Sequence, residues 1–486
     1  MVGLLSLLSL AVCTSRVQEP NEVRKFTVTP QAVPSPALRY VLLPPLKDLK
    51  TGNAVQDYYR YFAPDTIYLF RLPKFAESMY AWIESPYDQA ARKGLTPSQQ
   101  QQSKKNKDDD EEVTPATREE MSVFRQSQIF DEIDLAARRT YAEWDYLDRM
   151  KEQGMGLLLP DVQGIRLIAN IVHIRARLAV MDGDYEKALY HLQTGMAMSR
   201  HMNQANILIC SLTGLSIAKN MLKTVEEFIQ TPNAPNLYWA LTDLPNPFLD
   251  LRLAYAGDRM TIDYLLGDPK QLKERIFTND EMQKLVEKKL KPLLRTTGGN
   301  TSNDFSLLIL KEYPRAKVWL QEQGRSPADI EKMTATQAVM IFAHARFQVL
   351  ADDFAKLFQQ PLPERLVHVK AFQQKIKDLG AQGDASFFLG AYFFPHYPTV
   401  WITVSQADRD IALLRCVELL RNYAAGHNRQ LPAGWEDVKD LPVPIDPITG
   451  KRFGYILEGD HAVITAEAIP GSTIPRTERK YEVYLK

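Results

Sequence analysis

Apolar residues recur at helical spacing over most of the chain, so the sequence predicts a mainly α-helical protein. The clearest helices span 167–180 and 185–198, and the short connection Asp182-Gly183-Asp184 predicts that they form an antiparallel hairpin. A third helix, 207–229, extends this stack. Other helices are expected at 55–62, 73–84, 133–144, within 236–247, at 249–266, 280–294, 305–323 with a break at Pro314, 334–358, and 405–425 with a capping box of Ser405 and Asp408.

Small residues mark the predicted hairpin and indicate that its helices pack closely. Ala176, Ala188 and Gly195, with Gly183 and Tyr185 at the turn, have a spacing similar to that of a tetratricopeptide repeat. Small side chains allow two helix backbones to approach each other. Only one such unit is evident, whereas a regular array needs at least about three. We therefore expect an irregular stack of antiparallel helical hairpins, one of them tetratricopeptide-like.

The end of the chain has a different pattern, of short alternating segments separated by turn residues. Segments 453–457, 462–465 and 481–485 predict a small antiparallel sheet, which 26–28 or 38–43 from the N-terminal part would complete. Segment 380–398, rich in glycine and aromatic residues, is expected to be a loop packed on the body.

These patterns divide the chain into seven expected regions. They are a signal segment (1–13), an extended Pro-rich segment with possible edge strands (14–52), helices (53–92), a disordered charged insertion (93–118), the helical hairpin region (119–230), a further helical region (231–426) and a small β module (427–486). The insertion contains the acidic run 108–112. Consecutive acids cannot converge on one ion as alternating loop ligands do, so a solvated run is favoured over a calcium site.

The first residues have the pattern of a signal segment for export. Residues 4–12 are mostly apolar but too few to cross a bilayer core of roughly 30 Å as a helix. Ala11 and Cys13 form an A-x-C pattern that predicts cleavage before Thr14. A buried N-terminal strand is the alternative structural interpretation.

Cys13 is also a candidate for an N-terminal lipid anchor, because 10–13 is similar to a lipobox. Val12 departs from that motif, which requires a small residue at this position. No Lys or Arg precedes Arg16, so the basic region of a signal is missing, and a start further upstream would supply it.

Charge and cysteine content narrow the function classes. The chain has 59 Lys and Arg against 59 Asp and Glu, and this balance argues against general nucleic-acid binding. No later segment is apolar enough for a transmembrane helix in the mature chain. Cys210 and Cys416 could form a disulfide, but both lie in apolar helical patterns, which favours two buried free cysteines.

No segment carries a known catalytic motif, so catalytic residues stay unknown and no cofactor or metal site is predicted. Metalloprotease, serine-hydrolase, Walker and Cys-x-x-Cys signatures are all missing. His173, His191 and His201 lack further ligands at metal-binding spacing, and surface or capping histidines are favoured. Paired carboxylates for glycoside hydrolysis can be neither identified nor discarded from sequence, because their spacing is spatial.

Several charged and aromatic clusters admit both a binding and a structural interpretation. Arginines of the hairpin could grip an anion, but salt bridges within the stack are favoured. A lysine cluster is expected to be a solvated helix face, and the aromatic clusters to be core residues in preference to platforms for sugars or peptides. The residues concerned are Arg166, Arg175 and Arg177, then Lys284, Lys288, Lys289 and Lys291, then Tyr238, Trp239 and 393–397.

Six segments in order carry a resemblance to a known group. They are 52–54, 135–144, 166–169, 235–241, 313–316 and 446–451. Together they resemble a family of uncharacterised, exported, mostly helical proteins typical of planctomycete bacteria. The resemblance covers most of the mature chain and implies an extracytoplasmic helical protein, without implying an activity. The charged insertion departs from the family's pattern.

The C-terminal region is weakly similar to the globular end of pseudopilins, some of which bind calcium near the sheet. Asp446 is the only acid within the corresponding turn, and one carboxylate does not make a calcium site. The leading hypothesis is an exported binding or scaffold protein of the cell envelope, periplasmic or envelope-associated, with a protein, peptide or envelope polymer as partner. The alternatives are a cell-envelope hydrolase and a component of a pilus- or secretion-like machine.

Overall fold

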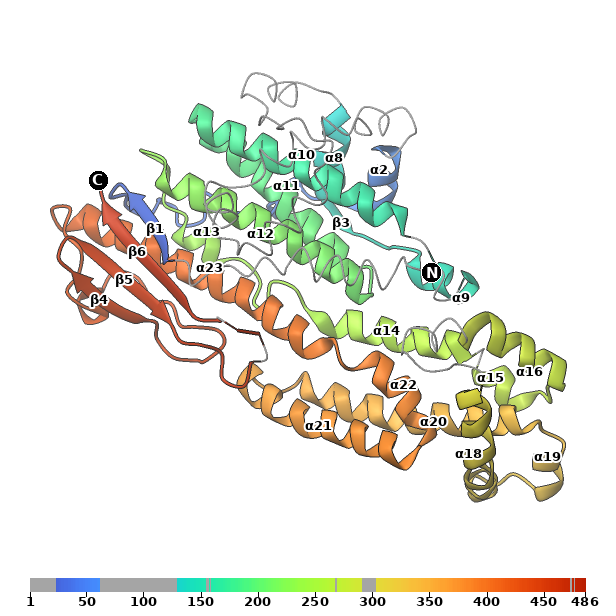
Figure 1. Ribbon diagram of the computed structural model, residues 1–486. Coiled ribbons are helices and arrows are strands. Elements are labelled where there is room, and N and C mark those ends of the chain that lie inside the picture. The colour runs from blue at the N-terminus through green and yellow to red at the C-terminus, as the bar shows by residue number, and fades with distance from the viewer. Residues whose placement is uncertain are drawn as a thin grey trace, which may run out of the picture.

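The computed structural model describes residues 23–61, 129–153, 157, 159–266, 269–290, 303–472, 474–475 and 477–486. It is mainly helical with a small mixed sheet at one end, which confirms the predicted fold class (Figure 1). The signal segment 1–13, the expected helix 73–84 and the insertion 93–118 lie outside the described residues.

Three long helices form the central layer: α10 (Pro160–Asp182), α11 (Tyr185–Asn203) and α12 (Leu208–Gln230). The predicted hairpin turn is present. Gly183 has a φ of 72° and caps α10, and the Asp184 carboxylate accepts a hydrogen bond from Lys187 N at the start of α11. Helices α11 and α12 approach each other closely, because a Cβ on Gly195 would overlap the Met221 side chain and a Cβ on Gly214 would lie 2.5 Å from the backbone carbonyl oxygen of Ser199. The tetratricopeptide-like character of this unit stays a prediction.

A small layer covers one face of the central helices. It contains the 3₁₀ helix η1 (Leu46–Asp48), β2 (Lys50–Asn53), α2 (Ala54–Tyr61), α8 (Ile129–Ala137), β3 (Arg139–Tyr141) and α9 (Tyr146–Gln153). The predicted helix 133–144 is wrong beyond Ala137, because the chain there pairs in parallel with β2. Trp144 then turns inward, where its Nε1 donates to the carbonyl of His201 at 2.8 Å.

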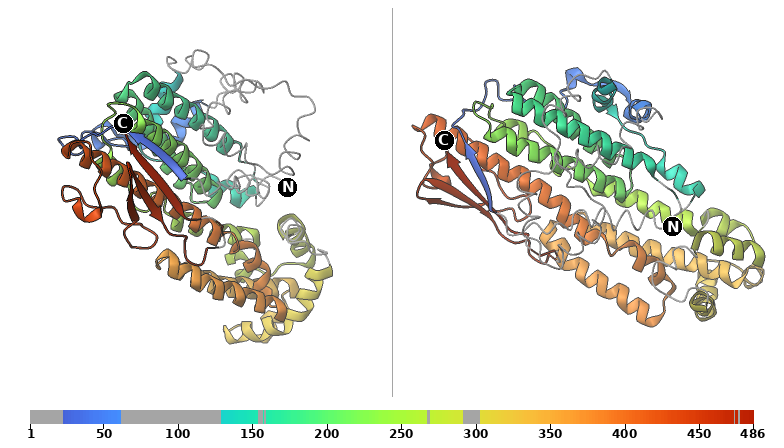
Figure 2. Two further views of the ribbon diagram at one scale, coloured as in Figure 1. Left: turned by 60° about the vertical axis from the view of Figure 1, so that its left-hand side comes forward. Right: turned by 45° about the horizontal axis from the view of Figure 1, so that its top comes forward.

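The other face of the central layer carries the remaining helices, which also form the far end of the molecule (Figure 2). They are α13 (Tyr238–Thr242), α14 (Leu251–Leu266), α15 (Pro269–Glu274), α16 (Asn279–Leu285) with the π-helical turn η4 (Val286–Leu290), α18 (Asn303–Glu322), α19 (Pro327–Glu331), α20 (Ala335–Leu357), α21 (Leu362–Gln382), α22 (Ala385–Phe393) and α23 (Tyr397–Gly426).

Three expectations in this region are wrong. Helix α18 continues through Pro314, whose ring leaves the carbonyl of Leu310 without its helical donor; both residues are exposed, so water can serve that carbonyl. The expected loop 380–398 instead contains α22 and the start of α23. Ser405 and Asp408 do not cap a helix, because α23 begins at Tyr397.

The sheet has the strand order β1-β6-β5-β4, formed by β1 (Val23–Val28), β4 (Gly454–Glu458), β5 (His461–Ala466) and β6 (Arg479–Leu485). The three C-terminal strands are antiparallel, as predicted, and β1 joins β6 in parallel. Segment 26–28 therefore supplies the predicted extra strand, whereas 38–43 forms turns and bends. The 3₁₀ turn η5 (Trp435–Asp437) precedes β4.

Two apolar clusters fill the molecule on opposite sides of the central layer. The smaller joins α2, α8, α9 and α10, and the larger joins α12 to α13, α14, α18, α20–α23 and the sheet. None of the described helices combines the length and apolar character that a membrane crossing requires. Cys210 and Cys416 are buried and unpaired, as predicted.

Candidate functional site

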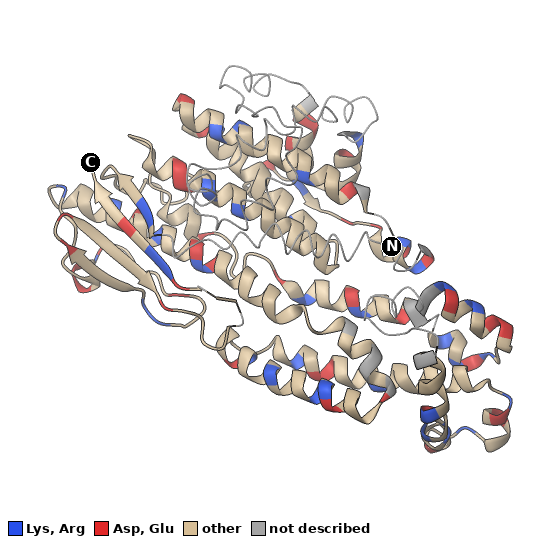
Figure 3. Ribbon diagram, in the orientation of Figure 1, with Lys and Arg blue, Asp and Glu red and all other residues tan. Residues whose placement is uncertain are grey.

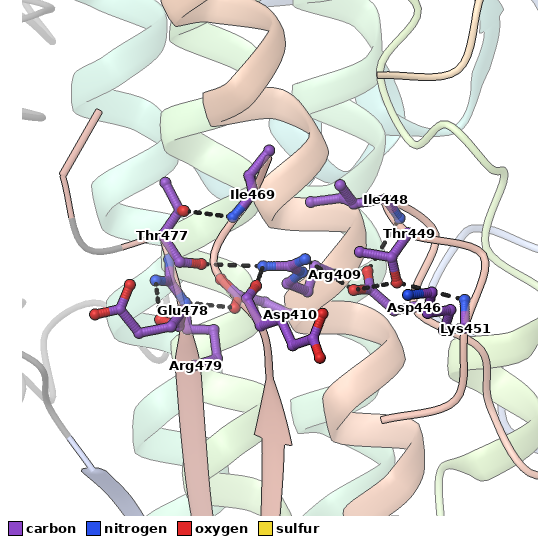
Figure 4. A network of polar contacts seen from close by, with 11 residues as sticks. Arg409, Asp410, Asp446, Ile448, Thr449, Lys451, Ile469, Thr477, Glu478 and Arg479 are labelled. Atoms are coloured by element: carbon purple, nitrogen blue, oxygen red, sulfur yellow. Dashed lines mark hydrogen bonds and ion pairs between the residues drawn. The ribbon is translucent and has the colours of Figure 1, made fainter. Parts of the chain in front are cut away.

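Arg409 of α23 forms a buried polar network, which lies between this helix and the C-terminal β region (Figure 4). Its Nε donates to Asp446 Oδ1 at 3.1 Å and its Nη2 to Asp446 Oδ2 at 2.8 Å, a bidentate ion pair. Its Nη1 donates to the carbonyls of Glu467 and Thr477 at 2.9 and 3.0 Å. One guanidinium therefore connects three separate segments.

The Asp446 carboxylate also holds its own turn together. It accepts hydrogen bonds from Ile448 N and from Thr449 Oγ1, each at 3.0 Å. Its oxygens thus receive four donors, which is the chemistry of a structural turn and a buried ion pair. Next to it, Arg479 of β6 donates to Asp410 of α23 at 3.2 Å (Figure 4). This cluster fixes α23 against the sheet.

A second buried pair on α23 fixes the N-terminal segment. Arg421 and Glu418 are fully buried and 2.8 Å apart. Arg421 donates to the carbonyls of Thr29 and Ala234, and Glu418 accepts from Leu237 N at 2.9 Å. Burial raises the pKa of Glu418 and the Arg421 charge opposes that rise. Both buried pairs on α23 therefore act in the assembly of the fold.

The hairpin arginines of the sequence form salt bridges within the helical layers, as favoured above. Arg175 pairs with Asp134 of α8 at 3.2 Å, and Arg177 pairs with Glu227 of α12 at 2.9 Å. The Arg175 pair is buried and not on a solvated face, because α8 covers it. Arg166 is half-buried.

Two carboxyls between α14 and α23 have strongly raised pKa values. Asp258 of α14 accepts hydrogen bonds from Leu208 N at 3.2 Å and from Tyr397 OH at 2.9 Å. Asp408 of α23 accepts from Phe248 N at 2.9 Å. Burial raises the pKa of each to about 7, and these hydrogen bonds oppose the rise. Near neutral pH, each carboxyl exists in both protonation states, so these are the two acid–base candidates of the described structure.

The histidine prediction is wrong, because His173, His191 and His201 are all buried. Burial lowers the pKa of each, to about 2 for His191 and about 4 for His201. They do not meet as ligands, and no group of metal-binding side chains occurs within the described ranges. His201 instead contacts Tyr58 OH through Nδ1 at 3.0 Å.

The aromatic and lysine clusters have the structural roles favoured by the sequence. Tyr238 is buried, and its hydroxyl donates to the carbonyl of Pro442. Phe393, Phe394 and Tyr397 pack in the larger apolar cluster with Phe354. Lys284 and Lys288 are exposed, while Lys289 and Lys291 have no described side chain.

An exposed apolar stripe lies on α18, at the end of the molecule opposite the sheet (Figure 1). Leu307, Leu310 and Val318 are 63%, 72% and 56% exposed, and Pro314 is exposed between them. Their spacing of three, four and four residues places all four on one face of the helix. This face could not be recognised from the sequence, because an exposed apolar stripe has the same spacing as a buried one.

Charges are interspersed along the helices and strands (Figure 3), which agrees with the neutral composition. Comparison with models of protein families, with curated proteins and with solved structures finds no match. The candidate functional features are therefore the exposed face of α18 and the two carboxyls between α14 and α23.

Proposed function

We propose that the protein is an exported binding or scaffold protein of the cell envelope, and that α18 binds an amphipathic helix of a partner protein. The observation that carries this proposal is the apolar face of Leu307, Leu310, Pro314 and Val318, three of which are more than half exposed. Burying one large aliphatic side chain contributes roughly 1.5–3 kcal/mol. Contiguous apolar surface of this kind is typical of an interaction site.

The geometry of α18 favours a helix as the partner. The opposite face of α18 is already held by the core through Ile309, Ala316 and Leu320, so the helix is a rigid support. A stripe along one face of a single helix fits the i, i+3, i+7 anchors of a second amphipathic helix.

Charges beside the stripe indicate the chemistry of that partner. Lys311 and Arg315 are exposed on the same turns of α18. Arg315 also neutralises the buried carboxylates of Glu312 and Asp384 at 2.9 and 3.4 Å. Lys311, whose Nζ donates to the carbonyl of Gln382, leaves a positive charge at this border of the stripe, and we expect an acidic residue beside the apolar anchors of the partner.

The hydrolase alternative rests on Asp258 and Asp408, whose raised pKa values are typical of acid–base residues. Paired glycosidase carboxyls lie roughly 5–9.5 Å apart. Tyr397, the partner of Asp258, precedes Asp408 by eleven residues on α23, which is about 16 Å along a helix. Two separate carboxyls support this alternative less well than the apolar face supports binding. The pilus- or secretion-like alternative stays a prediction.

The location in the envelope rests on the 1–13 segment and on the family resemblance. A fusion of residues 1–22 to a reporter that is active only after export tests it directly. Export of the reporter supports the location, and retention in the cytoplasm contradicts it. Replacement of Cys13 by Ser separates lipid anchoring from cleavage, because only the lipoprotein needs this thiol.

The binding proposal is tested by capture of partners from envelope extract with the wild-type protein, Leu307→Lys/Leu310→Lys and Val367→Lys. Val367 is an equally exposed apolar residue (62%) on α21 and serves as the matched control. We expect a defined partner to be retained by the wild type and by Val367→Lys, and lost with the double variant. Equal capture by all three, with unchanged circular dichroism, would contradict the proposal.

A further inference from the structure

The free edge of the sheet has a composition that natural edge strands usually avoid. Strand β4 lies at the end of the order β1-β6-β5-β4, and four of its five residues are exposed. Its central residues are Tyr455, Ile456 and Leu457, without a lysine, a proline or a bulge. Edge strands with exposed backbone groups are normally protected by such features, because they otherwise pair with another strand.

The opposite edge of the sheet is protected. Strand β1 packs beside α12, where Gln230 accepts a hydrogen bond from the backbone N–H of Thr27 at 3.2 Å. Arg24 also pairs with Glu226 of the same helix at 2.6 Å. In the described part of the chain, no backbone hydrogen bond reaches the outer side of β4. The two edges of the sheet therefore differ. Of the two edge strands, β4 is the one whose outer backbone N–H and C=O groups are free to pair with a further strand.

The hairpin that joins β4 to β5 determines which backbone groups face outward. Glu458 pairs with His461 across the two-residue turn Gly459-Asp460, and Gly459 has a φ of 62°, as the first position of a type II′ turn requires. Such a turn is closed by a hydrogen-bonded pair, and hydrogen-bonded pairs alternate along an antiparallel ladder. The N–H and C=O groups of Tyr455 and Leu457 consequently point away from β5.

We propose that β4 pairs with β4 of a second copy of this chain, antiparallel and with the two-fold axis at Ile456. In this register Tyr455 of each copy lies opposite Leu457 of the other, and the two residues exchange both of their outward hydrogen bonds. The two sheets become one continuous sheet. Pairing about a two-fold axis closes the assembly at a dimer.

Side-chain chemistry favours β4 of a second copy as the strand that pairs with the free edge of β4. Ile456, 59% exposed, meets its own counterpart at the axis and covers it. Glu458 lies opposite Gly454, so no like charges face each other along the strand. Just beyond the strand ends, Asp460 of one copy and Arg452 of the other lie at the same end of the strand pair, and these oppositely charged side chains are exposed, at 91% and 58%. Arg452 also pairs with Glu436 of its own chain at 3.3 Å. A five-residue strand pair is a small interface, so the dimer is weak and depends on concentration.

Sedimentation or light scattering over micromolar to near-millimolar concentrations tests the dimer. We expect the wild type to pass from monomer to dimer and Ile456→Lys to stay monomeric, because two lysines would then meet at the axis. The exposed position leaves the monomer folded, which circular dichroism verifies. A wild-type protein that is monomeric throughout, or a dimer unaffected by Ile456→Lys, would overturn the proposal.

Cysteine crosslinking tests the register. Ile456→Cys is expected to form an intermolecular disulfide on mild oxidation, since only the axial residue faces itself. Leu457→Cys, one residue along the same strand, faces Tyr455 and is expected to crosslink far less. Wild-type protein oxidised in parallel corrects for the native cysteines, of which Cys210 and Cys416 are buried. Stronger crosslinking of Leu457→Cys would reject this register.

Discussion

Tyr397, the first residue of α23, donates a hydrogen bond of 2.9 Å to Asp258 in the middle of α14. Leu208 N, at the start of α12, donates to the other oxygen of the same carboxyl at 3.2 Å. One side chain thus joins three helices that come from distant parts of the sequence. Because burial raises the pKa of Asp258 to about 7, this junction depends on pH.

Replacement of Asp258 by Asn is expected to change the pH dependence of stability. The pKa of Asp258 is higher in the folded chain, about 7, than its ordinary value of 3.8, so the folded state binds the proton more tightly. This carboxyl therefore stabilises the fold below about pH 4, and that contribution is lost as the pH rises to 7. Asn can accept from Leu208 N with its Oδ1 and donate to Tyr397 OH with its Nδ2, and it does not ionise. In urea unfolding, the free energy of unfolding of Asp258→Asn relative to that of the wild type should rise from pH 5 to pH 8.

Asp440 is exposed and provides the matched control for this prediction. Asp440→Asn should show the same change in the free energy of unfolding between pH 5 and pH 8 as the wild type. If Asp258→Asn lost stability at pH 8, the carboxylate would be needed in its charged form and the predicted sign would be wrong.

Replacement of Arg409 by Met is expected to lower the free energy of unfolding by about 3–5 kcal/mol, because it leaves the Asp446 carboxylate buried without a cation. Adding Asp446→Asn to this variant should recover part of the loss. Arg452→Met removes an exposed pair with Glu436 and should cost at most about 1 kcal/mol. Equilibrium unfolding in urea measures all three, and equal losses for Arg409→Met and Arg452→Met would contradict the buried pair.

Helices with one apolar face could be predicted from the sequence, and those without one could not. Helix α20, for example, was expected at 334–358 and spans Ala335–Leu357. Residues 397–404 were missed as helix, because Val400, Trp401 and Ile402 are all buried and a helix covered on every side has no apolar period. At Tyr141 the helical spacing was present, but pairing with the distant strand β2 determined the structure.

The candidate site was less predictable than the fold, because its partners are distant in sequence. Arg409 and Asp446 are 37 residues apart, and nothing in their spacing indicates a contact. The exposed stripe of α18 does have a visible spacing, yet exposure depends on whether another element covers it. The burial of His173 likewise has no local signal in the sequence, since the residues around a histidine on an apolar helix are similar whether the histidine is buried, caps the helix or faces solvent.

Replacement of Gly257 by Ala is expected to destabilise the fold by about 1–3 kcal/mol. A Cβ at this position of α14 would overlap the backbone carbonyl oxygen of Asn206, and backbone cannot move aside as a flexible side chain can. Gly426, the last residue of α23, has no atom near such a Cβ. Gly426→Ala should therefore be neutral or stabilising by up to about 1 kcal/mol. Thermal unfolding of both variants checks the contrast, and an unchanged melting temperature for Gly257→Ala would show that α14 can shift.

Replacement of His173 by Leu is expected to stabilise the protein in acid. Neither ring nitrogen of His173 has a hydrogen-bond partner in the described structure, and its side chain is 1% exposed. Burial lowers the pKa of His173 well below 6.5, and the positive charges of Arg177 and Lys223 lower it further. The unfolded chain therefore binds the proton more tightly than the folded chain does. The contribution of neutral His173 to the free energy of unfolding is fully present above pH 6.5 and is lost as the pH falls. Each pH unit below that value costs at most about 1.4 kcal/mol, so the loss at pH 5 is at most roughly 2 kcal/mol.

Urea unfolding at pH 7 and pH 5 measures this effect as a difference between His173→Leu and the wild type. We expect the stability of the variant relative to the wild type to be greater at pH 5 than at pH 7, by up to roughly 2 kcal/mol. His368 is exposed on α21, so His368→Leu should leave the pH dependence unchanged. A wild type and a His173→Leu variant that lose stability in parallel between pH 7 and pH 5 would mean that the folded protein protonates this histidine as easily as the unfolded chain does.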